Sequence, residues 1–301
     1  MINVVFGLDD NFAKHCGATI VSILDNHKMD TENDKIHFFI LGNLSQDNKN
    51  KFLELKKIQN FEMDFIGIDI NEFRGLPVLK FISLATYNRL LIPELLPENV
   101  EKAIYLDCDI IVKKDISLLW NINVKEHLIA AVSDNYGYFN AGVLMFNIKA
   151  LREFDFYNKW KEYVKHNEVV WVDQDILNAV LAGRVLYIPP NWNLPYGTLL
   201  KKGKYYNRKY LKTFISFSYI IHFSASDKPW HALCPHPLKK YYFKYAFMTP
   251  WKNEIKQYSA FIVSIEFIKK LFKYWLAHPI FFIKPKFWQR LNEKGYLMAI
   301  F

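Results

Sequence analysis

Residues 103–109 read AIYLDCD and are followed by the apolar triplet Ile110-Ile111-Val112. A run of β-branched and aromatic residues of this length is typical of a buried strand. The strand ends in two carboxylates one residue apart, at the carboxyl end, where open α/β sheets bind their ligands. Because side chains alternate along an extended chain, Asp107 and Asp109 are predicted to point to the same side.

The carboxylates of Asp107 and Asp109 would repel each other at one point unless a cation lay between them. A hard divalent metal ion is the usual partner of such a pair. A metal held in this way can bind a diphosphate, as transferases that use nucleotide sugars require. The alternative is a strand that ends in a solvated acidic turn, and this stretch alone leaves both interpretations open.

The composition is that of a folded protein with a large core. The chain has 301 residues, of which 51% are hydrophobic and 17% aromatic, enough for one α/β domain with an appendage. Cys16, Cys108 and Cys234 are odd in number and far apart, so we expect buried free thiols in a reducing compartment. Met1 leads directly into a strand-like run, so we expect no secretory signal.

Apolar patterning alternates between strand and helix along most of the chain. Strands are predicted at residues 3–8, 35–41, 61–68, 103–106, 127–134, 141–147, 184–188 and 219–223. Helices are predicted at residues 12–26, 46–59, 85–92, 150–166 and 173–182, the third of them stopped by Pro93. This order predicts an α/β fold with a mostly parallel central sheet flanked by helices, the last two strands closing the sheet. We expect a catalytic domain at residues 1–235 and a helical, basic region at residues 236–301.

Polar residues follow the first predicted strand, where Gly7 precedes Asp9 and Asn11. Glycine lets a flat ring approach the backbone, and the two polar side chains offer hydrogen-bonding groups where a helix starts. Helix capping explains these residues as well as contact with a nucleoside does. Arg89 lies in an otherwise apolar predicted helix and could hold a phosphate or fix a pair of carboxylates. A surface arginine with its charge in water is the alternative.

Two later segments place polar groups where a sugar could lie. Asp134 precedes a short turn that leads to Asn140, at the start of a predicted strand. Asp173 and Gln174 begin a predicted helix, where capping explains Asp173 about as well as recognition of a sugar does.

The last predicted strand ends at a histidine and leads into a basic loop. His222 could complete a metal site, although a single histidine in this position is often structural. Lys228 follows it and could contact phosphate from a loop stiffened by Pro229.

Taken in this order, the segments resemble glycosyltransferase family 8 over roughly residues 2–251. The resemblance rests on six motifs, which are FGLDDN, TYNR, YLDCD, FNAGV, DQDILN and a block that reads H…KPWH. Each motif alone is weak evidence, but six in the right order are strong. The chain is most similar to bacterial lipopolysaccharide galactosyl- and glucosyltransferases that also carry a basic C-terminal segment. The resemblance implies a GT-A fold, a UDP-galactose or UDP-glucose donor, and Mn²⁺ or Mg²⁺.

The resemblance also implies roles for individual residues. The implied metal ligands are Asp107, Asp109 and His222. The implied contacts with the donor are Gly7, Asp9, Asn11, Arg89, Asn140, Ala225 and Lys228. Ala225 departs from the family pattern, because relatives often have glycine there. The residues implied at the reacting sugar are Gln174, Asp173 and Asp134.

Members of this family retain the anomeric configuration, and the residues leave the chemistry of retention open. Glycosidases retain configuration with a carboxylate nucleophile, whereas the family position here is Gln174, whose amide is a poor nucleophile. We therefore favour attack by the acceptor hydroxyl on the same face of the sugar, through an ion-pair-like transition state. Asp173 and Asp175 stay open as alternative nucleophiles. The short segment between Asp134 and Asn140 predicts an acceptor pocket that is more open or differently lidded.

The C-terminal region is basic and aromatic. Residues 239–301 carry about a dozen lysines and arginines against three glutamates. Residues 261–276 place apolar and lysine side chains on opposite sides of a helical period, which suits the surface of an anionic membrane but not a bilayer span. Residues 281–288 extend the same chemistry. The alternative is a helix packed on the catalytic domain, and nucleic-acid binding is disfavoured because no recognised module is present.

The expected function is therefore that of a metal-dependent, retaining hexosyltransferase on the cytoplasmic face of the inner membrane. Its expected partners are a nucleotide-sugar donor, a glycolipid or oligosaccharide acceptor, and the anionic membrane surface. A transferase that glycosylates protein or itself, and a nucleotide-sugar-binding protein without catalysis, are the alternatives. Galactose and glucose differ in the direction of one hydroxyl, so the sequence leaves both donors open.

Overall fold

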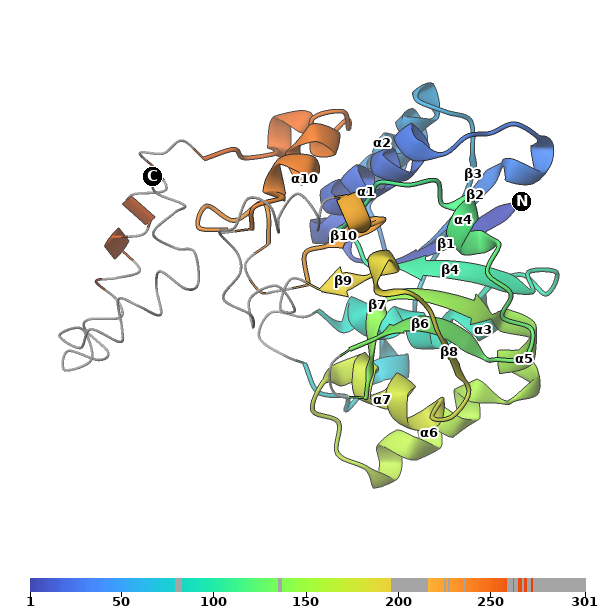
Figure 1. Cartoon of the computed structure of the whole chain (residues 1–301). Helices are drawn as coiled ribbons and strands as arrows, with labels where there is room; N and C mark the ends of the chain where they lie inside the picture. The colour runs from blue at the N-terminus through green and yellow to red at the C-terminus, as the bar shows by residue number, and fades with distance from the viewer. Residues whose placement is uncertain are drawn as a thin grey trace.

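The structure is a computed structural model that describes most of the chain in full side-chain detail (Figure 1). The described residues are 1–78, 83–134, 137–195, 216–224, 226, 228–234, 236–258, 262, 265–266, 268–269 and 272. The predicted tail segments at 261–276 and 281–288 therefore lie almost wholly outside the described residues, as does Ala225. Within the described residues, no helix combines the length and the apolar character that crossing a bilayer demands.

A seven-stranded sheet forms the centre of the molecule, with the strand order β3-β2-β1-β4-β7-β6-β8. Its strands are β1 (Ile2–Gly7), β2 (Ile36–Leu41), β3 (Glu62–Ile66), β4 (Lys102–Leu106), β6 (Ile129–Ser133), β7 (Phe139–Asn147) and β8 (Val185–Tyr187). Only β7 runs antiparallel to its neighbours β4 and β6, and the other pairings in this sheet are parallel. The predicted α/β fold with a mostly parallel sheet is confirmed.

A second, three-stranded sheet lies beside the first and has the order β5-β10-β9. It contains β5 (Ile110–Val112), β9 (Leu194–Pro195) and β10 (Ile220–His222). The prediction that residues 219–223 close the main sheet is wrong, because the chain turns at residues 108–109 and β5 leaves the main sheet to pair antiparallel with β10. This pairing places His222 opposite Ile110, next to the two aspartates.

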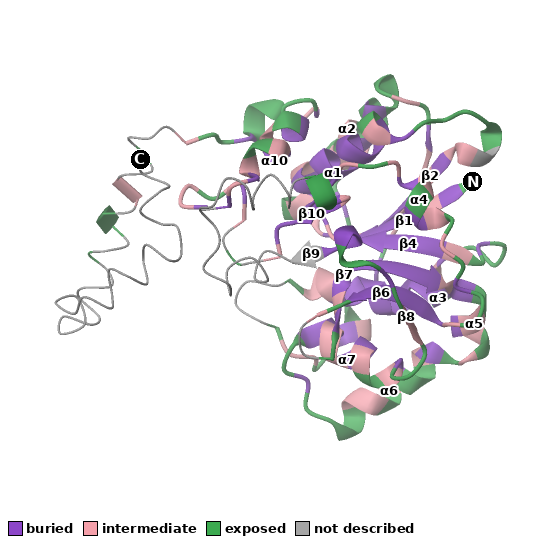
Figure 2. Ribbon diagram, in the orientation of Figure 1, coloured by how far each residue is buried: buried purple, intermediate pink, exposed green. Residues whose placement is uncertain are grey.

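Helices cover both faces of the main sheet, and alternate residues of each strand feed two separate cores. On β4, Ile104 and Leu106 join the core beneath α1 (Ala13–Asn26), whereas Ala103 and Tyr105 join the core beneath the opposite helices. Those helices are α3 (Ile92–Leu95), α5 (Ile148–Glu153), α6 (Phe156–His166) and α7 (Val172–Val180). Figure 2 shows the strands of the main sheet buried between these layers.

Several predicted helices differ from the observed ones in their bounds. The predicted helix at 150–166 is two helices, α5 and α6, because Asp155 between them adopts a left-handed conformation with φ of 57°. The predicted helix at 85–92 is the 3₁₀ helix η5 (Leu84–Leu91), which continues into α3. Pro93 lies in the first turn of α3, where a missing N–H costs nothing, and so does not end the helix. The helix predicted at 46–59 is α2 (Gln46–Glu54) followed by the 3₁₀ turn η3 (Leu55–Lys57).

Other short elements were not predicted from the sequence. They are β9, α4 (Ser117–Trp120), and the 3₁₀ helices η1 (Asp10–Phe12), η2 (Glu32–Asp34), η4 (Ile70–Phe73), η6 (Pro190–Trp192) and η7 (Lys252–Glu254). The last α-helix, α10 (Lys239–Ala246), packs against α1. Its Tyr242 hydroxyl is 2.7 Å from Nδ1 of His15, and its Tyr245 hydroxyl accepts a hydrogen bond from Asn26. The division of the chain at residue 235 stays a prediction.

Candidate active site

A cavity of about 960 Å³ opens at the carboxyl ends of β1 and β4. The start of the antiparallel strand β7, the N-terminus of α7 and the end of β10 reach the same edge of the sheet (Figure 1). Most of the sequence-predicted site residues line this cavity, namely Gly7, Asp9, Asn11, Arg89, Asp107, Asp109, Asn140, Asp173, Gln174, His222 and Lys228. Asp134 is not among the lining residues, and its carboxylate accepts a hydrogen bond from the backbone N–H of Tyr138.

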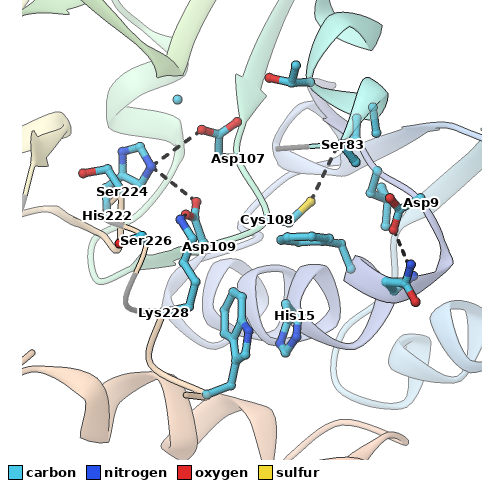
Figure 3. A pocket seen from close by; sticks show the side chains of 18 of the residues that line it. Asp9, His15, Ser83, Asp107, Cys108, Asp109, His222, Ser224, Ser226 and Lys228 are labelled. Carbon is cyan, nitrogen blue, oxygen red and sulfur yellow. Dashed lines mark hydrogen bonds and ion pairs between the residues drawn. The ribbon is translucent and has the colours of Figure 1, made fainter. Parts of the chain in front are cut away.

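Asp107, Asp109 and His222 converge on one point at the cavity wall (Figure 3). Nε2 of His222 lies 3.6 Å from Oδ2 of Asp107 and 3.3 Å from Oδ1 of Asp109. One ligand atom from each residue lies within 4.8 Å of the other two. The two carboxylates meet because of the turn at residues 108–109, and not by alternation along an extended strand as the sequence predicts.

Each of the two carboxylates has one oxygen bound by protein groups and one oxygen directed at the shared point. Oδ1 of Asp107 accepts hydrogen bonds from Arg89 (2.7 Å) and from the Tyr105 hydroxyl (3.0 Å). Oδ2 of Asp109 forms an ion pair with Nζ of Lys228. Oδ1 of Asp109 is buried and has no hydrogen-bond donor among the described residues.

A buried carboxylate oxygen without a donor is costly, and a cation satisfies it without any donor. Two carboxylates and one imidazole form a ligand set that suits divalent metals such as Mn²⁺. The unsatisfied oxygen of Asp109 and the neighbouring imidazole of His222 therefore fit a metal ion.

Gly142 makes room for this cluster from the adjacent strand β7. A Cβ atom at this position would lie 2.3 Å from Cε1 of His222 and 2.6 Å from Oδ2 of Asp107. Any larger residue would displace both groups, so the ligand cluster depends on glycine here.

Burial and neighbouring opposite charges set the pKa values of the ionisable groups in the site. Burial alone would raise the pKa of Asp109, but Lys228 and His222 outweigh it and lower the pKa, so the carboxylate is ionised at neutral pH. Burial raises the pKa of Asp173 above its usual 3.8, and the positive charge of Arg89 only partly opposes this rise. Burial would lower the pKa of Arg89, but Asp107 and Asp173 more than offset it, so the guanidinium stays charged.

Arg89 lies inside the protein and connects the metal-ligand cluster to α7. Its side chain is 6% exposed, and it contacts Asp107 through Nη2 and Oδ2 of Asp173 through Nε at 3.1 Å. Nη1 donates to the carbonyl of Ala141 at 2.6 Å, and the guanidinium stacks 4.4 Å from the Tyr105 ring centroid. The alternative of a surface arginine is wrong, whereas the predicted ability to fix a carboxylate pair matches these contacts. Its predicted contact with the donor stays a prediction.

The helix α7 brings Asp173 and Gln174 to the cavity from its first turn. Oδ1 of Asp173 accepts a hydrogen bond of 2.6 Å from the Thr86 hydroxyl. The alternative nucleophile Asp175 instead accepts hydrogen bonds from the backbone N–H groups of Val170 and Trp171. Gln174 thus presents its side chain to the cavity, whereas Asp175 caps the helix.

The end of the cavity where Asp9 and Asn11 lie was predicted to contact a nucleoside, and this contact stays a prediction. Asp9 accepts a hydrogen bond of 3.0 Å from the backbone N–H of Asn11, so the capping interpretation applies to it. Gly7 is needed for a reason that the sequence did not predict. A Cβ there would lie 3.0 Å from Cβ of Asn88 and 3.2 Å from the carbonyl of Ala85, so η5 packs closely against this glycine. Gly7 also lines the cavity, and its predicted contact with a nucleoside stays a prediction.

Two more features at or beside the cavity were not predicted from the sequence. Asn193, fully buried beside β9, hydrogen-bonds His222 and Asn140. The rings of His15 and Trp230 stack at 3.5 Å in the cavity wall (Figure 3). Asn193 and His15 carry no local sequence signal, and the KPWH motif that contains Trp230 does not reveal the stacking on His15, because long-range packing brings these residues together. The three cysteines are buried and form no disulfide, as predicted.

Comparison with known proteins places the chain in a family. The model of glycosyl transferase family 8 matches residues 3–234, and the chain belongs to this family. General stress protein A of Bacillus subtilis is 29% identical over 275 residues, covering 84% of this chain and 96% of that protein. The lipopolysaccharide 1,2-glucosyltransferase of Escherichia coli K12 is 27% identical over 296 residues, covering 92% of this chain and 86% of that protein.

Solved structures agree with this placement. The galactosyltransferase LgtC, crystallised with donor and acceptor sugar analogues, matches with a TM-score of 0.71 and 25% identity. The match covers 84% of this chain and 99% of LgtC. The GT-A-type fold and the membership in glycosyltransferase family 8 that the motifs predicted are confirmed.

Proposed function

We propose that the protein is a metal-dependent, retaining hexosyltransferase that moves galactose or glucose from a UDP-sugar to the sugar of a bacterial surface glycolipid. The observation that carries the proposal is the cluster of Asp107, Asp109 and His222, with a buried oxygen of Asp109 that lacks a donor within the described part of the chain. The similarity to a lipopolysaccharide glucosyltransferase and to the galactosyltransferase LgtC supports a hexose donor and a glycolipid acceptor.

Asp107, Asp109 and His222 would hold the metal, which supplies positive charge to the diphosphate as the sugar–phosphate bond breaks. Lys228 lies beside the three ligand residues. Its Nζ pairs with Asp109 and donates to the carbonyl of Phe223 at 2.9 Å. It is therefore positioned to transfer its hydrogen bonds to a phosphate oxygen, which stabilises the leaving UDP.

The groups opposite the leaving group are polar but poorly nucleophilic. Gln174 reaches the cavity with an amide, and Asp173 is held by Arg89 and Thr86. Neither residue offers a free carboxylate to the anomeric carbon. These contacts support attack by the acceptor hydroxyl on the same face of the sugar, with the amide of Gln174 close to the developing positive charge.

The proposal is tested by UDP release from purified full-length protein with Mn²⁺ and four donors, UDP-Gal, UDP-Glc, UDP-GlcNAc and UDP-GalNAc. We expect turnover with one of the two hexoses, and loss of turnover in Asp107→Asn and Asp109→Asn. Asp47→Asn is a matched control, because Asp47 lies exposed on α2 away from the cavity. Equal turnover in all four proteins would rule the proposal out.

The same experiment separates the other functions. Added hexose units on the protein itself, seen by intact-mass spectrometry after incubation with the donor, would indicate a self-glycosylating enzyme. Tight binding of the UDP-sugar with neither hydrolysis nor transfer would indicate a binding protein without catalysis.

A further inference from the structure

Asn193 is a fully buried polar residue that lies between His222 and Asn140. It follows η6 and precedes β9, in a part of the chain far in sequence from β7. Its Nδ2 donates to Oδ1 of Asn140 at 2.7 Å, and its Oδ1 lies 2.8 Å from Nδ1 of His222. Its amide therefore connects Asn140, at the start of β7, to the imidazole of His222.

The direction of these hydrogen bonds follows from one backbone group. The N–H of Gly142 can only donate, and it points at the side chain of Asn140 at 3.0 Å, so the atom that it meets must be the carbonyl oxygen Oδ1. The Asn193 atom that contacts the same oxygen must then be its NH₂ group. The other end of the Asn193 amide is consequently an oxygen, which requires Nδ1 of His222 to carry the proton.

The same chain of amides runs on to the reacting end of the cavity. Nδ2 of Asn140 donates to Oε1 of Gln174 at 3.4 Å, and the backbone N–H of Ala141 points at the same oxygen at 3.4 Å. Because the N–H of Ala141 can only donate, the Gln174 atom that it meets must be the carboxamide oxygen. This oxygen is therefore turned toward β7.

We propose that Asn193 is a positioning residue that holds His222 in the tautomer protonated at Nδ1. In this tautomer the lone pair of Nε2 is directed at Oδ2 of Asp107 and Oδ1 of Asp109, as metal ligation requires. The inference rests on the proposed function only for the identity of the metal. The tautomer itself is a property of the metal-free chain.

Replacing the Asn193 amide removes the acceptor that selects this tautomer. Neutral histidine would then be free to carry its proton on Nε2, where it would donate to the carboxylates and block the ligand position. Loss of a hydrogen-bond partner behind a metal-ligating histidine typically costs about 10- to 100-fold in metal affinity. Asn193→Leu therefore should bind Mn²⁺ more weakly by that factor.

The test combines two readouts on the full chain. Two-bond ¹H–¹⁵N spectra of metal-free, ¹⁵N-labelled protein, recorded at a pH where the spectra show a neutral imidazole, report the tautomer, with the His222 signal assigned by its loss in His222→Gln. Titration with Mn²⁺ reports the affinity. The variants are Asn193→Leu and Asn193→Asp, of which the second keeps an acceptor for Nδ1 of His222. Asn191→Leu is the matched control, because Asn191 is buried two residues away and its Oδ1 has no partner among the described residues.

We expect the Nδ1-protonated tautomer in the wild type, in Asn193→Asp and in the control, and its loss in Asn193→Leu with the stated fall in Mn²⁺ affinity. A neutral His222 that carries its proton on Nε2 and not on Nδ1 in the metal-free wild type would overturn the proposal. So would wild-type tautomer and affinity in folded Asn193→Leu. A wild type with the expected tautomer but without Mn²⁺ binding would contradict the proposed function and leave the role of Asn193 supported.

Discussion

Replacing Arg89 by methionine tests the electrostatic connection between the metal-ligand cluster and α7. Arg89 pairs with Asp107 and Asp173, whose side chains are 24% and 5% exposed. Methionine fills a similar volume but leaves Asp173 as a buried charge that has lost its ion pair and keeps the hydrogen bond from the Thr86 hydroxyl. Removing one partner of a buried ion pair costs about 3–5 kcal/mol, so we expect the free energy of unfolding to fall by that amount.

The loss of stability in Arg89→Met is also expected to depend on pH, which gives a second, independent test. The pKa of Asp173 is already raised in the folded protein, and without Arg89 burial would raise it further. The folded state then binds a proton more readily than the unfolded state, so its stability falls as the pH rises above the unfolded pKa of 3.8. Arg89→Met is therefore expected to lose more stability at pH 8 than at pH 5.

Urea denaturation of metal-free protein measures both effects. The control is the double variant Arg89→Met/Asp173→Asn, in which the buried charge is removed while Thr86 still finds an acceptor. We expect the double variant to recover a large part of the lost stability and to lose the extra pH dependence. A loss below about 1 kcal/mol in Arg89→Met, as for an exposed ion pair, would refute the reasoning.

Three further predictions follow from other parts of the structure. Gly142→Ala should weaken Mn²⁺ binding at least about 10-fold in a titration, because its methyl group would displace His222, whereas Gly67→Ala, away from the cluster, should not. Burial lowers the pKa of His15 to about 3, so the stability it contributes is full above pH 6.5 and is lost as the pH falls toward 3. His15→Phe should therefore reduce the slope of unfolding free energy against pH in that window, by up to about 1.4 kcal/mol per pH unit, as measured by urea titrations. An unchanged slope would contradict a neutral, buried His15. Deleting residues 259–301 should abolish sedimentation with anionic vesicles, and unchanged sedimentation would assign that segment a packing role instead.

The sequence predicted those parts of the site that depend on local pattern. The strand before Asp107 is apolar and β-branched, and two carboxylates at its carboxyl end indicate a ligand site in any open α/β sheet. The position of His222 at a strand end was also predicted. Its sheet was not, because strand pairing between β5 and β10 joins segments more than a hundred residues apart and leaves no periodic signal.

The contacts made by buried polar groups were the least predictable part. Arg89 could be named as a residue able to fix carboxylates, but only the structure shows that both Asp107 and Asp173 are its partners. Asn193 carries no local signal, and the FNAGV motif that contains Gly142 does not reveal that this glycine makes room for His222 and Asp107. Asp155 divides a predicted helix through one left-handed residue, which an apolar period does not reveal.

The central claim is that Asp107, Asp109 and His222 bind a metal ion. Calorimetric titration of the wild type and of Asp109→Asn with Mn²⁺ tests it most directly. Asparagine keeps the size of the side chain and can still accept from Lys228, but it removes the charge that the cation requires. We expect one Mn²⁺ per chain in the wild type, and an affinity lower by at least about 10-fold in the variant. Equal affinity in both proteins, or no Mn²⁺ binding by the wild type, would contradict a metal site at Asp107, Asp109 and His222.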